Sequence, residues 1–340
     1  MKQQVMTAPG EIIFRDVPVP DMGPSDIKIK MEKIGVCGSD IHVWHGKHPY
    51  TSYPVTQGHE ISATVVDMGP EVKGFEVGDL VTVMPQVVCG KCYPCTPGMY
   101  NECEELKAMG FQTTGMASDY FVVDAGWALK LPEKLTPDLG ACIEPLACGV
   151  HAVRRFGDPK GKKCVVMGGG TIGNLVGQAL NALGAEKVLL SEVSQCRLET
   201  AKRCGITVVD PTEKPLRDAI YDEFGPDGAD VIFECIGNGK TLNEAVQIAR
   251  KGSTVIVMGV VADPYPIDMG LVQDHELNLI GTAMYRVEDW KESIELVDRG
   301  LIDLGILITH HVPFSEYEEA YRLIDRERDK AMKVMIDMGE

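Results

Sequence analysis

The stretch from Lys163 to Glu192 reads KCVVMGGGTIGNLVGQALNALGAEKVLLSE, and it decides the fold of the chain. Its first residues, Lys163 to Met167, form an apolar run that is short enough for a buried strand. Asn174 to Leu183 then carries apolar residues at helical spacing, and Val188 to Leu190 is typical of a second buried strand. The stretch therefore predicts a strand–helix–strand unit of the kind that opens a dinucleotide-binding fold.

Three glycines with G-x-G-x-x-G spacing join the first strand to the helix. Gly168 permits the tight turn, Gly170 lets the backbone approach a pyrophosphate, and Gly173 lets the helix pack closely on the strand. The helix N-terminus offers N–H groups and a positive dipole end to that anion. Glu192 can accept hydrogen bonds from the adenosine ribose and would repel a 2′-phosphate, which favours NAD over NADP. The expected cofactor-binding residues here are Gly168, Gly170, Thr171, Ile172, Gly173, Glu192 and Arg197.

The composition of the 340-residue chain is that of a globular protein, and the length favours two domains. No apolar run approaches the roughly 18 residues of a membrane span, and MKQQVMTAPG at the start is unlike a signal peptide. We expect a cytoplasmic protein, in which the eleven cysteines serve as thiols and metal ligands rather than disulfides. The formal net charge of −17 argues against nucleic acid or an anionic membrane as a partner.

The N-terminal part is typical of a β-rich domain. Ile27 to Ile34 alternates between apolar and polar residues, and Ile61 to Val66 and Leu80 to Val83 are further strand candidates. Two motifs lie between these strands, GVCGSDIH at residues 35–42 and GHE at residues 58–60. They supply a thiolate, an imidazole and a carboxylate, which are all good zinc ligands.

One further carboxylate, Glu144, lies in an apolar run just before the nucleotide-binding stretch. A carboxylate is costly to bury unless it is paired or bound to a metal. Alone, Cys37 would more often be a structural cysteine and His59 a core histidine. Together with Glu144 they predict a metal site.

Four cysteines at positions 89, 92, 95 and 103 follow the spacing C-x2-C-x2-C-x7-C on a loop rich in glycine and proline. Four thiolates so close together form a closed tetrahedral site that is typical of structural zinc. The alternative is an iron–sulfur site, because C-x2-C-x2-C also occurs there, although the last spacing fits ferredoxin patterns poorly. The expected structural ligands are Cys89, Cys92, Cys95 and Cys103.

After Glu192 the chain alternates between helical and strand patterns up to a sixth strand candidate, Leu277 to Gly281. Six parallel strands with helices between them predict a doubly wound α/β sheet. Ligands bind at the carboxyl ends of such strands, which favours Ile236, Gly237 and Val260 as neighbours of the nicotinamide half. We expect a nucleotide-binding domain at residues 151–284 and a catalytic domain at residues 1–150 and 285–340.

These motifs, with IEPLACGVHA at residues 143–152, extend over essentially the whole chain. The chain resembles a zinc-dependent medium-chain alcohol dehydrogenase, and the Glu-Pro-Leu stretch is most similar to the sorbitol, polyol, butanediol and threonine dehydrogenase branch. The resemblance implies an N-terminal β-rich GroES-like catalytic domain, a doubly wound parallel-sheet Rossmann domain and two zinc ions per chain. It also implies a homotetramer, with the four-cysteine lobe as a plausible interface element.

The resemblance further implies roles for single residues. Cys37, His59 and Glu144 surround the catalytic zinc, and Glu60 is an alternate or water-bridged ligand. Ser39 and His42 relay the substrate proton outward, so that the expected catalytic residues are Ser39, His42 and Glu60. The family pattern GHE-x-x-G is broken by Ala63, which should alter local packing only, and the flanking Cys142 and Cys148 are alternative third ligands.

The activity implied is the NAD-dependent oxidation of a secondary alcohol of a polyol or sugar-derived substrate. Tyr285 and Arg286 resemble the substrate side of polyol enzymes, and Arg286 would also suit a sugar acid or a sugar phosphate. The main alternatives are L-threonine 3-dehydrogenase and 2,3-butanediol dehydrogenase. A more distant alternative is a regulatory protein that binds NAD and zinc without catalysis, against which the intact Ser39 and His42 argue.

Overall fold

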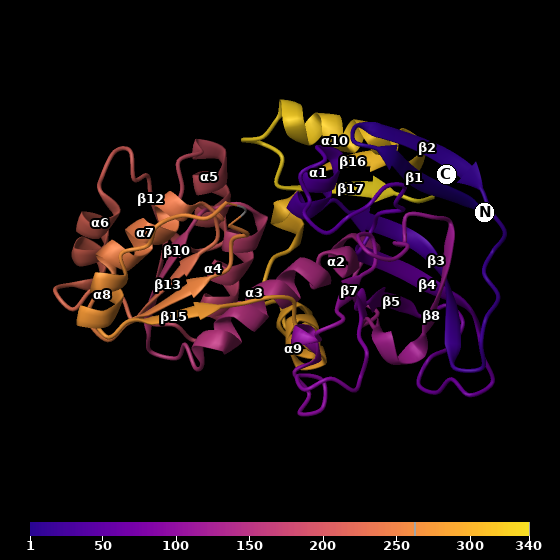
Figure 1. Ribbon diagram of the computed structural model, residues 1–340, viewed down its shortest axis with the longest axis horizontal. Coiled ribbons are helices and arrows are strands. Elements are labelled where there is room, and N and C mark those ends of the chain that lie inside the picture. Colours follow the sequence, from indigo (N-terminus) through magenta and orange to yellow (C-terminus); the bar gives the residue numbers. More distant parts are fainter. Residues whose placement is uncertain (262, 340) are drawn as a thin grey trace. The chain divides into compact units, whose positions relative to one another are not determined.

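The structure is a computed structural model that describes residues 1–261 and 263–339 (Figure 1). It divides into two compact units, Met1–Glu144 with Ile308–Glu340, and Pro145–Leu307. The boundaries between these units follow Glu144 and Leu307, whereas the sequence predicted boundaries after residues 150 and 284. Helix α3 (Ile143–Phe156) runs without interruption through the first of them, and α9 (Val287–Asp298) packs within the second unit through the buried Asp289.

The first unit is built on a seven-stranded sheet in the order β16-β17-β3-β4-β5-β9, with β8 also paired to β3. Its central strand β3 (Asp26–Gly35) alternates as the sequence predicts, because Ile27, Ile29 and Met31 are buried while Lys30 is exposed. The other strands are β4 (Glu60–Met68), β5 (Leu80–Val83), β8 (Tyr120–Asp124), β9 (Ala128–Lys130), β16 (Ile308–Pro313) and β17 (Lys333–Asp337).

Smaller elements complete this unit. The hairpin of β1 (Lys2–Ala8) and β2 (Glu11–Asp16) and the short pair of β6 (Gln86–Val87) and β7 (Lys107–Ala108) lie apart from the main sheet. The helices are α1 (Gly38–Trp44), α2 (Pro137–Ala141) and α10 (Tyr317–Arg326). The sequence patterns did not predict α1 or β16.

The second unit is a six-stranded parallel sheet in the order β12-β11-β10-β13-β14-β15, which confirms the doubly wound fold. Its strands are β10 (Lys163–Met167), β11 (Lys187–Ser191), β12 (Thr207–Val209), β13 (Val231–Glu234), β14 (Thr254–Val257) and β15 (Asn278–Gly281). Strand β10 is buried on both faces. Val165 packs in a core with residues of the helices α6 (Leu216–Phe224) and α7 (Gly239–Ile248), while Val166 faces α4 (Thr171–Ala182).

Helices cover both faces of this parallel sheet (Figure 1). They are α4 (Thr171–Ala182), α5 (Gln195–Arg203), α6 (Leu216–Phe224), α7 (Gly239–Ile248) and α8 (Met269–Asp274), together with α3 and α9. Helix α4 begins at Thr171, three residues earlier than the apolar spacing predicts. None of the described helices combines the length and the apolar character that a bilayer crossing would require.

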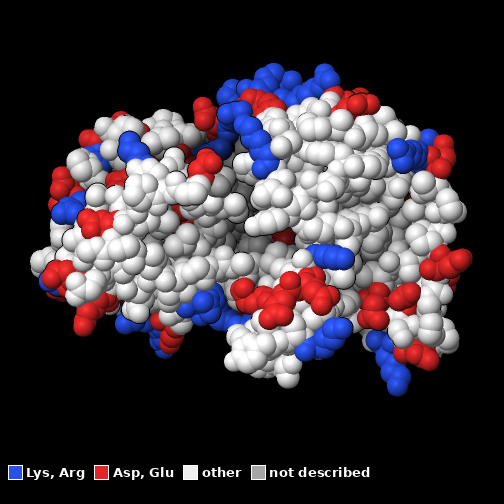
Figure 2. Space-filling view, viewed as in Figure 1, with Lys and Arg blue, Asp and Glu red and all other residues white. Residues whose placement is uncertain are grey.

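Acidic and basic side chains both reach the surface, and the basic ones gather near the end of α10 on the face shown in Figure 2. Arg322 and Arg326 of α10 are paired with Glu318 and Glu319 of the same helix. Exposed ion pairs of this kind contribute about 1 kcal/mol or less. The positive charge of this patch is therefore partly compensated by its own helix.

Candidate metal centres and nucleotide site

Three potential ligands from the two N-terminal motifs meet in the first unit. A sulfur of Cys37, a ring nitrogen of His59 and a carboxylate oxygen of Glu60 all lie within 4.8 Å of one another. The antiparallel register of β3 and β4 explains this, because Gly35 at the end of β3 pairs with Glu60 at the start of β4. The sheet thus brings together motifs that are about twenty residues apart in the sequence.

The charges around His59 favour a cation. Burial lowers the pKa of His59, but Asp40, Cys37 and Glu144 raise it more, so that the pKa lies well above its usual value. His59 is 5% exposed, and its Nδ1 atom faces Asp40 Oδ1 at 3.5 Å without a hydrogen bond to any described residue. Sulfur, nitrogen and oxygen donors in a buried, negatively charged setting fit a zinc ion.

Glu144 is nearly buried and close enough to act electrostatically on His59, but it does not belong to the group of ligand atoms within 4.8 Å. Glu60 takes that place in this structure. Cys142 is also buried, and its burial raises the pKa of the thiol to about 12. Like Glu144, Cys142 lies outside the group of described ligand atoms that are within 4.8 Å of one another.

Lys333 of β17 forms an ion pair with the carboxylate of Glu60. The sequence patterns did not predict this contact. The Nζ atom of Lys333 donates to Glu60 Oε2 and to the carbonyl oxygen of Val36 (3.2 Å). Lys333 is 2% exposed and Glu60 is 1% exposed, so this is a buried ion pair. The available signal was a lysine inside the otherwise apolar run of the last strand.

The two expected relay residues lie on α1, directly after the candidate ligand Cys37. Cys37 is the N-cap residue of this helix, Ser39 is half-buried, and His42 is exposed one turn later. Residues three apart lie on the same face of a helix. The helix therefore leads from the candidate metal centre to solvent, as a proton path requires.

The four-cysteine lobe forms a second cluster in the same unit, with all four ligand sulfurs within 4.8 Å of one another. Cys92 Sγ lies 3.3 Å from Cys95 Sγ and 3.9 Å from Cys103 Sγ, and none of these cysteines forms a disulfide. Tetrahedral zinc with bonds of about 2.3 Å places its sulfurs roughly 3.8 Å apart. An iron–sulfur cluster would need wider spacing, because iron and sulfide lie between its thiolates.

Hydrogen bonds within the lobe prepare it for a cation. The backbone N–H groups of Cys89 and Cys92 donate to the sulfurs of Cys103 and Cys89, each at 3.3 Å. The hydrogen bond from the backbone of Glu104, aided by Cys95, lowers the pKa of Cys92 to about 7. A thiolate is therefore accessible at neutral pH, as metal binding requires.

The glycine-rich turn and Glu192 line a cavity of ≈ 410 Å³ in the second unit. Gly168 has a φ of +97°, and a Cβ on Gly173 would lie 1.8 Å from the carbonyl oxygen of Gly168. A Cβ on Gly170 would meet open space, which leaves its backbone accessible to a ligand. Thr171 and Ile172 form the first turn of α4 beside it. The cavity is also lined by Arg197 and Ile236.

Glu192 holds the turn as well as facing the cavity. Its Oε2 accepts from the N–H of Gly169 (2.8 Å), and its Oε1 accepts from Val193 (2.7 Å) and Ser194 (2.9 Å). Arg197 Nη1 lies 3.7 Å from Glu192 Oε2. The arginine is thus already engaged by the carboxylate that a 2′-phosphate would have to approach.

A second buried carboxylate, Glu234 at the end of β13, was also missed. Its Oε1 accepts from the N–H groups of Ile236 (3.0 Å) and Gly237 (3.2 Å) and from the hydroxyl of Thr241 (2.8 Å). Gly237 approaches Val260 closely, because a Cβ there would lie 2.6 Å from the Val260 carbonyl oxygen. Glu234 therefore fixes the turn that carries the residues expected near the nicotinamide.

The two expected substrate residues differ in their surroundings. Tyr285 is fully buried and packs edge-to-face on Trp290, with ring centroids 5.2 Å apart. It is a core residue and offers no surface to a substrate in this structure. Arg286 is the N-cap residue of α9, and its backbone N–H donates to Asp289 Oδ2 (2.7 Å), while its side chain is half-buried.

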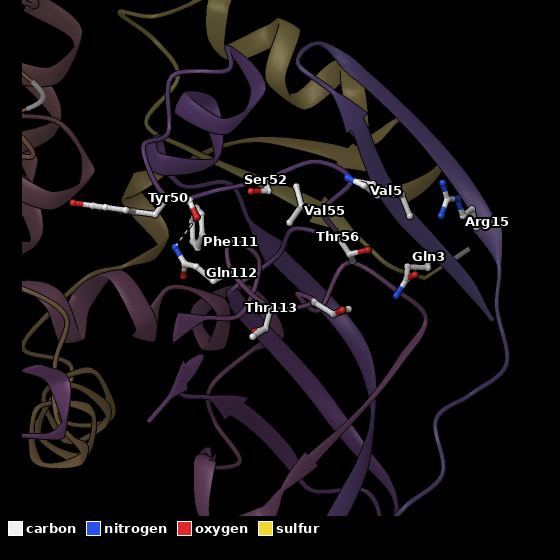
Figure 3. Close-up of a pocket in the computed structure, with 12 residues that line it drawn as sticks. Gln3, Val5, Arg15, Tyr50, Ser52, Val55, Thr56, Phe111, Gln112 and Thr113 are labelled. Carbon is white, nitrogen blue, oxygen red and sulfur yellow. Dashed lines mark hydrogen bonds between the residues drawn. The ribbon is translucent and has the colours of Figure 1, made fainter. Parts of the chain in front are cut away.

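A cavity of ≈ 570 Å³ lies in the first unit, and Cys37, His59 and Glu60 are not among its lining residues (Figure 3). Phe111 lines it, and the Phe111 ring lies 4.9 Å from the His59 ring and 4.8 Å from the His48 ring. Arg15 is the charged residue of the lining, and no acid occurs in it. The remaining lining residues are Gln3, Val5, Tyr50, Ser52, Pro54, Val55, Thr56, Gln112, Thr113 and Thr114.

Known proteins match both units of the chain. The alcohol dehydrogenase GroES-like domain matches residues 23–133, and the zinc-binding dehydrogenase domain matches residues 171–299. The 2-dehydro-3-deoxy-L-galactonate 5-dehydrogenase of Pseudoalteromonas atlantica is 34% identical over 92% of this chain and 91% of its own. The L-threonine 3-dehydrogenase of Pyrococcus horikoshii is 34% identical over 94% of this chain and 93% of its own.

A solved structure is similar over both units. It is described as a zinc-binding dehydrogenase from Sinorhizobium meliloti 1021 bound to NADP. It has a TM-score of 0.90 and 30% identity, and the match covers 99% of each chain.

Proposed function

Because this chain belongs to the zinc-dependent medium-chain alcohol dehydrogenase family, we propose that it oxidises a secondary alcohol of a sugar-derived substrate to a ketone. The observation that carries the proposal is the convergence of Cys37, His59 and Glu60 in one buried, negatively charged site. A glycine-turn nucleotide cavity in the same chain supplies the place for a hydride acceptor.

The metal would be held by Cys37 and His59, with Glu144 as third ligand and Glu60 as alternate ligand. When bound, zinc would polarise the substrate hydroxyl, and a bound nicotinamide would serve as the hydride acceptor. The pairing of Glu60 with Lys333 supports the alternate role, because a carboxylate held by an ammonium group is a weaker permanent ligand. Ser39 takes the substrate proton, and the exposed His42 passes it to solvent.

The proposed dinucleotide is NAD. Glu192 lines the nucleotide cavity, and its carboxylate would repel a 2′-phosphate. Arg197 pairs with that carboxylate, which reduces its availability for a phosphate. The NADP bound to the similar Sinorhizobium meliloti protein makes this preference worth measuring directly.

We favour a polyhydroxylated substrate over an amino acid. A relative whose name specifies a sugar-derived substrate, the 2-dehydro-3-deoxy-L-galactonate 5-dehydrogenase of Pseudoalteromonas atlantica, is 34% identical over 92% of this chain. Diols and L-threonine are the competing substrates, and the panel described below compares them directly. Arg286 stays a candidate for contact with a sugar acid or a sugar phosphate.

We also propose a homotetramer in the cytoplasm. Strand β15 is an edge strand of the parallel sheet, and its Leu279 is exposed, which is the kind of edge that a second copy can cover. The free thiols of the four-cysteine lobe suit a reducing compartment. Light scattering that found a stable monomer at micromolar concentration would contradict the assembly.

The test of the activity is NAD reduction measured against a panel of polyols, diols, sugar acids and threonine. We expect turnover with a polyol or a sugar acid, and its loss in Cys37→Ser with NAD binding nearly intact. Metal content and NAD titration of the same samples separate loss of metal from loss of cofactor. Full activity of Cys37→Ser would reject the assigned metal centre.

A further inference from the structure

A chain of buried polar side chains connects α10 to the candidate metal centre. The hydroxyl of Tyr321 donates to Gln57 Oε1 (2.6 Å), and Gln57 Nε2 donates to Asp40 Oδ1 (3.0 Å). Tyr321 and Gln57 are 0% exposed and Asp40 is 1% exposed. Buried polar groups need partners, and these three largely satisfy one another.

Asp40 touches the residues on both sides of the metal centre. Its Oδ2 accepts from the backbone N–H of Cys37 (3.0 Å), and its Oδ1 lies 3.5 Å from His59 Nδ1. The amide of Gln57 and the imidazole of His59 therefore face the same carboxylate oxygen. A change in the position of Asp40 would therefore move the His59 ring, and with it Nε2, the ring nitrogen that does not face Asp40.

The direction of the Gln57 amide is set by Tyr321. A tyrosine hydroxyl that donates to the amide oxygen leaves the amide nitrogen facing Asp40. The Tyr321 ring is itself held in a stack on Trp44, with centroids 5.3 Å apart and planes 21° apart. The backbone N–H of Gln57 also donates to Gln4 Oε1 (3.2 Å), which holds the residue from its other side.

We propose that Gln57 and Tyr321 are positioning residues that act through Asp40 to fix the His59 ring for metal binding. This inference rests on the proposed function, because it takes Cys37 and His59 as zinc ligands. Groups that orient metal-bound histidines are worth about 10- to 100-fold in metal affinity. Because Tyr321 acts through Gln57, its effect should be the smaller one and should vanish when Gln57 is replaced.

The test compares Gln57→Leu, Tyr321→Phe and the double variant with the natural chain, in full-length metal-loaded protein. One measurement is the rate at which a chelator removes zinc from the Cys37 centre, identified as the phase absent in Cys37→Ser. The other is the visible absorption of the cobalt-substituted protein, which reports the geometry around the metal. The control is Ser118→Ala, which removes a buried hydroxyl of the same unit that donates to the Tyr120 carbonyl oxygen.

We expect zinc loss about 10-fold faster in Gln57→Leu and about 3-fold faster in Tyr321→Phe, with an altered cobalt spectrum in both. The double variant should match Gln57→Leu, and Ser118→Ala should match the natural chain. Unchanged loss rates and spectra in Tyr321→Phe and Gln57→Leu would overturn the inference, as would additive effects in the double variant. If Gln57→Leu does not fold, Tyr321→Phe alone decides. If Cys37→Ser keeps the full zinc content, the proposed function fails instead.

Discussion

Replacing Lys333 by methionine tests how the first unit tolerates the carboxylate at its metal centre. Lys333 and Glu60 are almost fully buried, and the lysine also donates to the Val36 carbonyl oxygen (3.2 Å). Methionine keeps most of the side-chain volume but removes the ammonium group. The variant therefore leaves a buried carboxylate without its counter-charge.

The expected cost follows from the burial of both partners. Breaking a buried ion pair by removing one side destabilises a protein by about 3–5 kcal/mol. For a domain of this size that corresponds to a fall in melting temperature of roughly 6–20 °C. Burial lowers the pKa of Lys333, but Glu60, Cys37 and Cys142 raise it more, so the pKa lies above its usual value. A lysine whose pKa is raised on folding stabilises the folded protein fully below about pH 10, and this contribution is lost only at higher pH. The loss of stability in Lys333→Met should therefore be constant from about pH 6 to 9.

The assay is thermal unfolding of the metal-loaded protein, with Lys33→Met as the matched control. Lys33 pairs with Asp337 at 2.7 Å on the neighbouring strand β17, but their side chains are 22% and 34% exposed. A partly exposed pair contributes about 1 kcal/mol or less, so Lys33→Met should shift melting by only a few degrees. Glu60→Gln added to Lys333→Met should recover more than half of the loss, because no buried charge remains.

Equal melting shifts for Lys333→Met and Lys33→Met would refute the reasoning, because the two pairs differ mainly in burial. Failure of the double variant to recover stability would show that the loss comes from packing rather than from the unpaired charge.

Three further outcomes follow from the sites. Freshly prepared protein should contain two zinc ions per chain by elemental analysis, with one lost in Cys37→Ser and the other in Cys92→Ser; iron with visible absorbance would instead favour a cluster in the four-cysteine lobe. Glu192→Ala should reduce the ratio of kcat/KM for NAD over NADP by about 10- to 100-fold, and an unchanged ratio would contradict the role of this carboxylate. His42→Ala should keep its zinc while turnover falls about 10- to 1000-fold with partial recovery at high pH; a pH profile parallel to that of the natural chain would remove His42 from the proton path.

The elements that the sequence predicts best are those with strict periodicity. Strand β10, the glycine turn and the final strand of the sheet all occur where the apolar patterns place them. The pattern of β10 is clear because a strand buried on both faces must be apolar throughout. Helix α1 is different. Its sequence, GSDIHVW, is short and polar at its start, and Cys37 is its N-cap residue. Local propensity is too weak to predict a helix of this length.

Motifs predict ligands better than they predict the groups that hold them. Cys37 and His59 stand in recognisable motifs, so their meeting could be anticipated from the chain alone. Lys333 and Tyr321 lie more than 260 positions away from their partners in the sequence. No spacing rule connects residues so far apart, because only the tertiary fold brings them together. Tyr285 differs from these residues, because the resemblance to polyol enzymes suggested a substrate contact while its ring is fully buried in this structure.

The buried ion pair of Lys333 and Glu60 can form only late in protein synthesis, because its two residues lie far apart in the sequence. The two residues are 273 positions apart, so a ribosome that makes about 5–20 residues per second needs roughly 14–55 s between them. During that time Cys37 and His59 have left the ribosome, but Lys333 and Tyr321 do not yet exist. A nascent chain that captured metal early would do so at a half-built site with an unpaired carboxylate. Correct assembly of this candidate centre is therefore tied to completion of the last strand, and a stop codon shortly before residue 333 would produce a chain that has Cys37, His59 and Glu60 but lacks the ammonium group that pairs with Glu60.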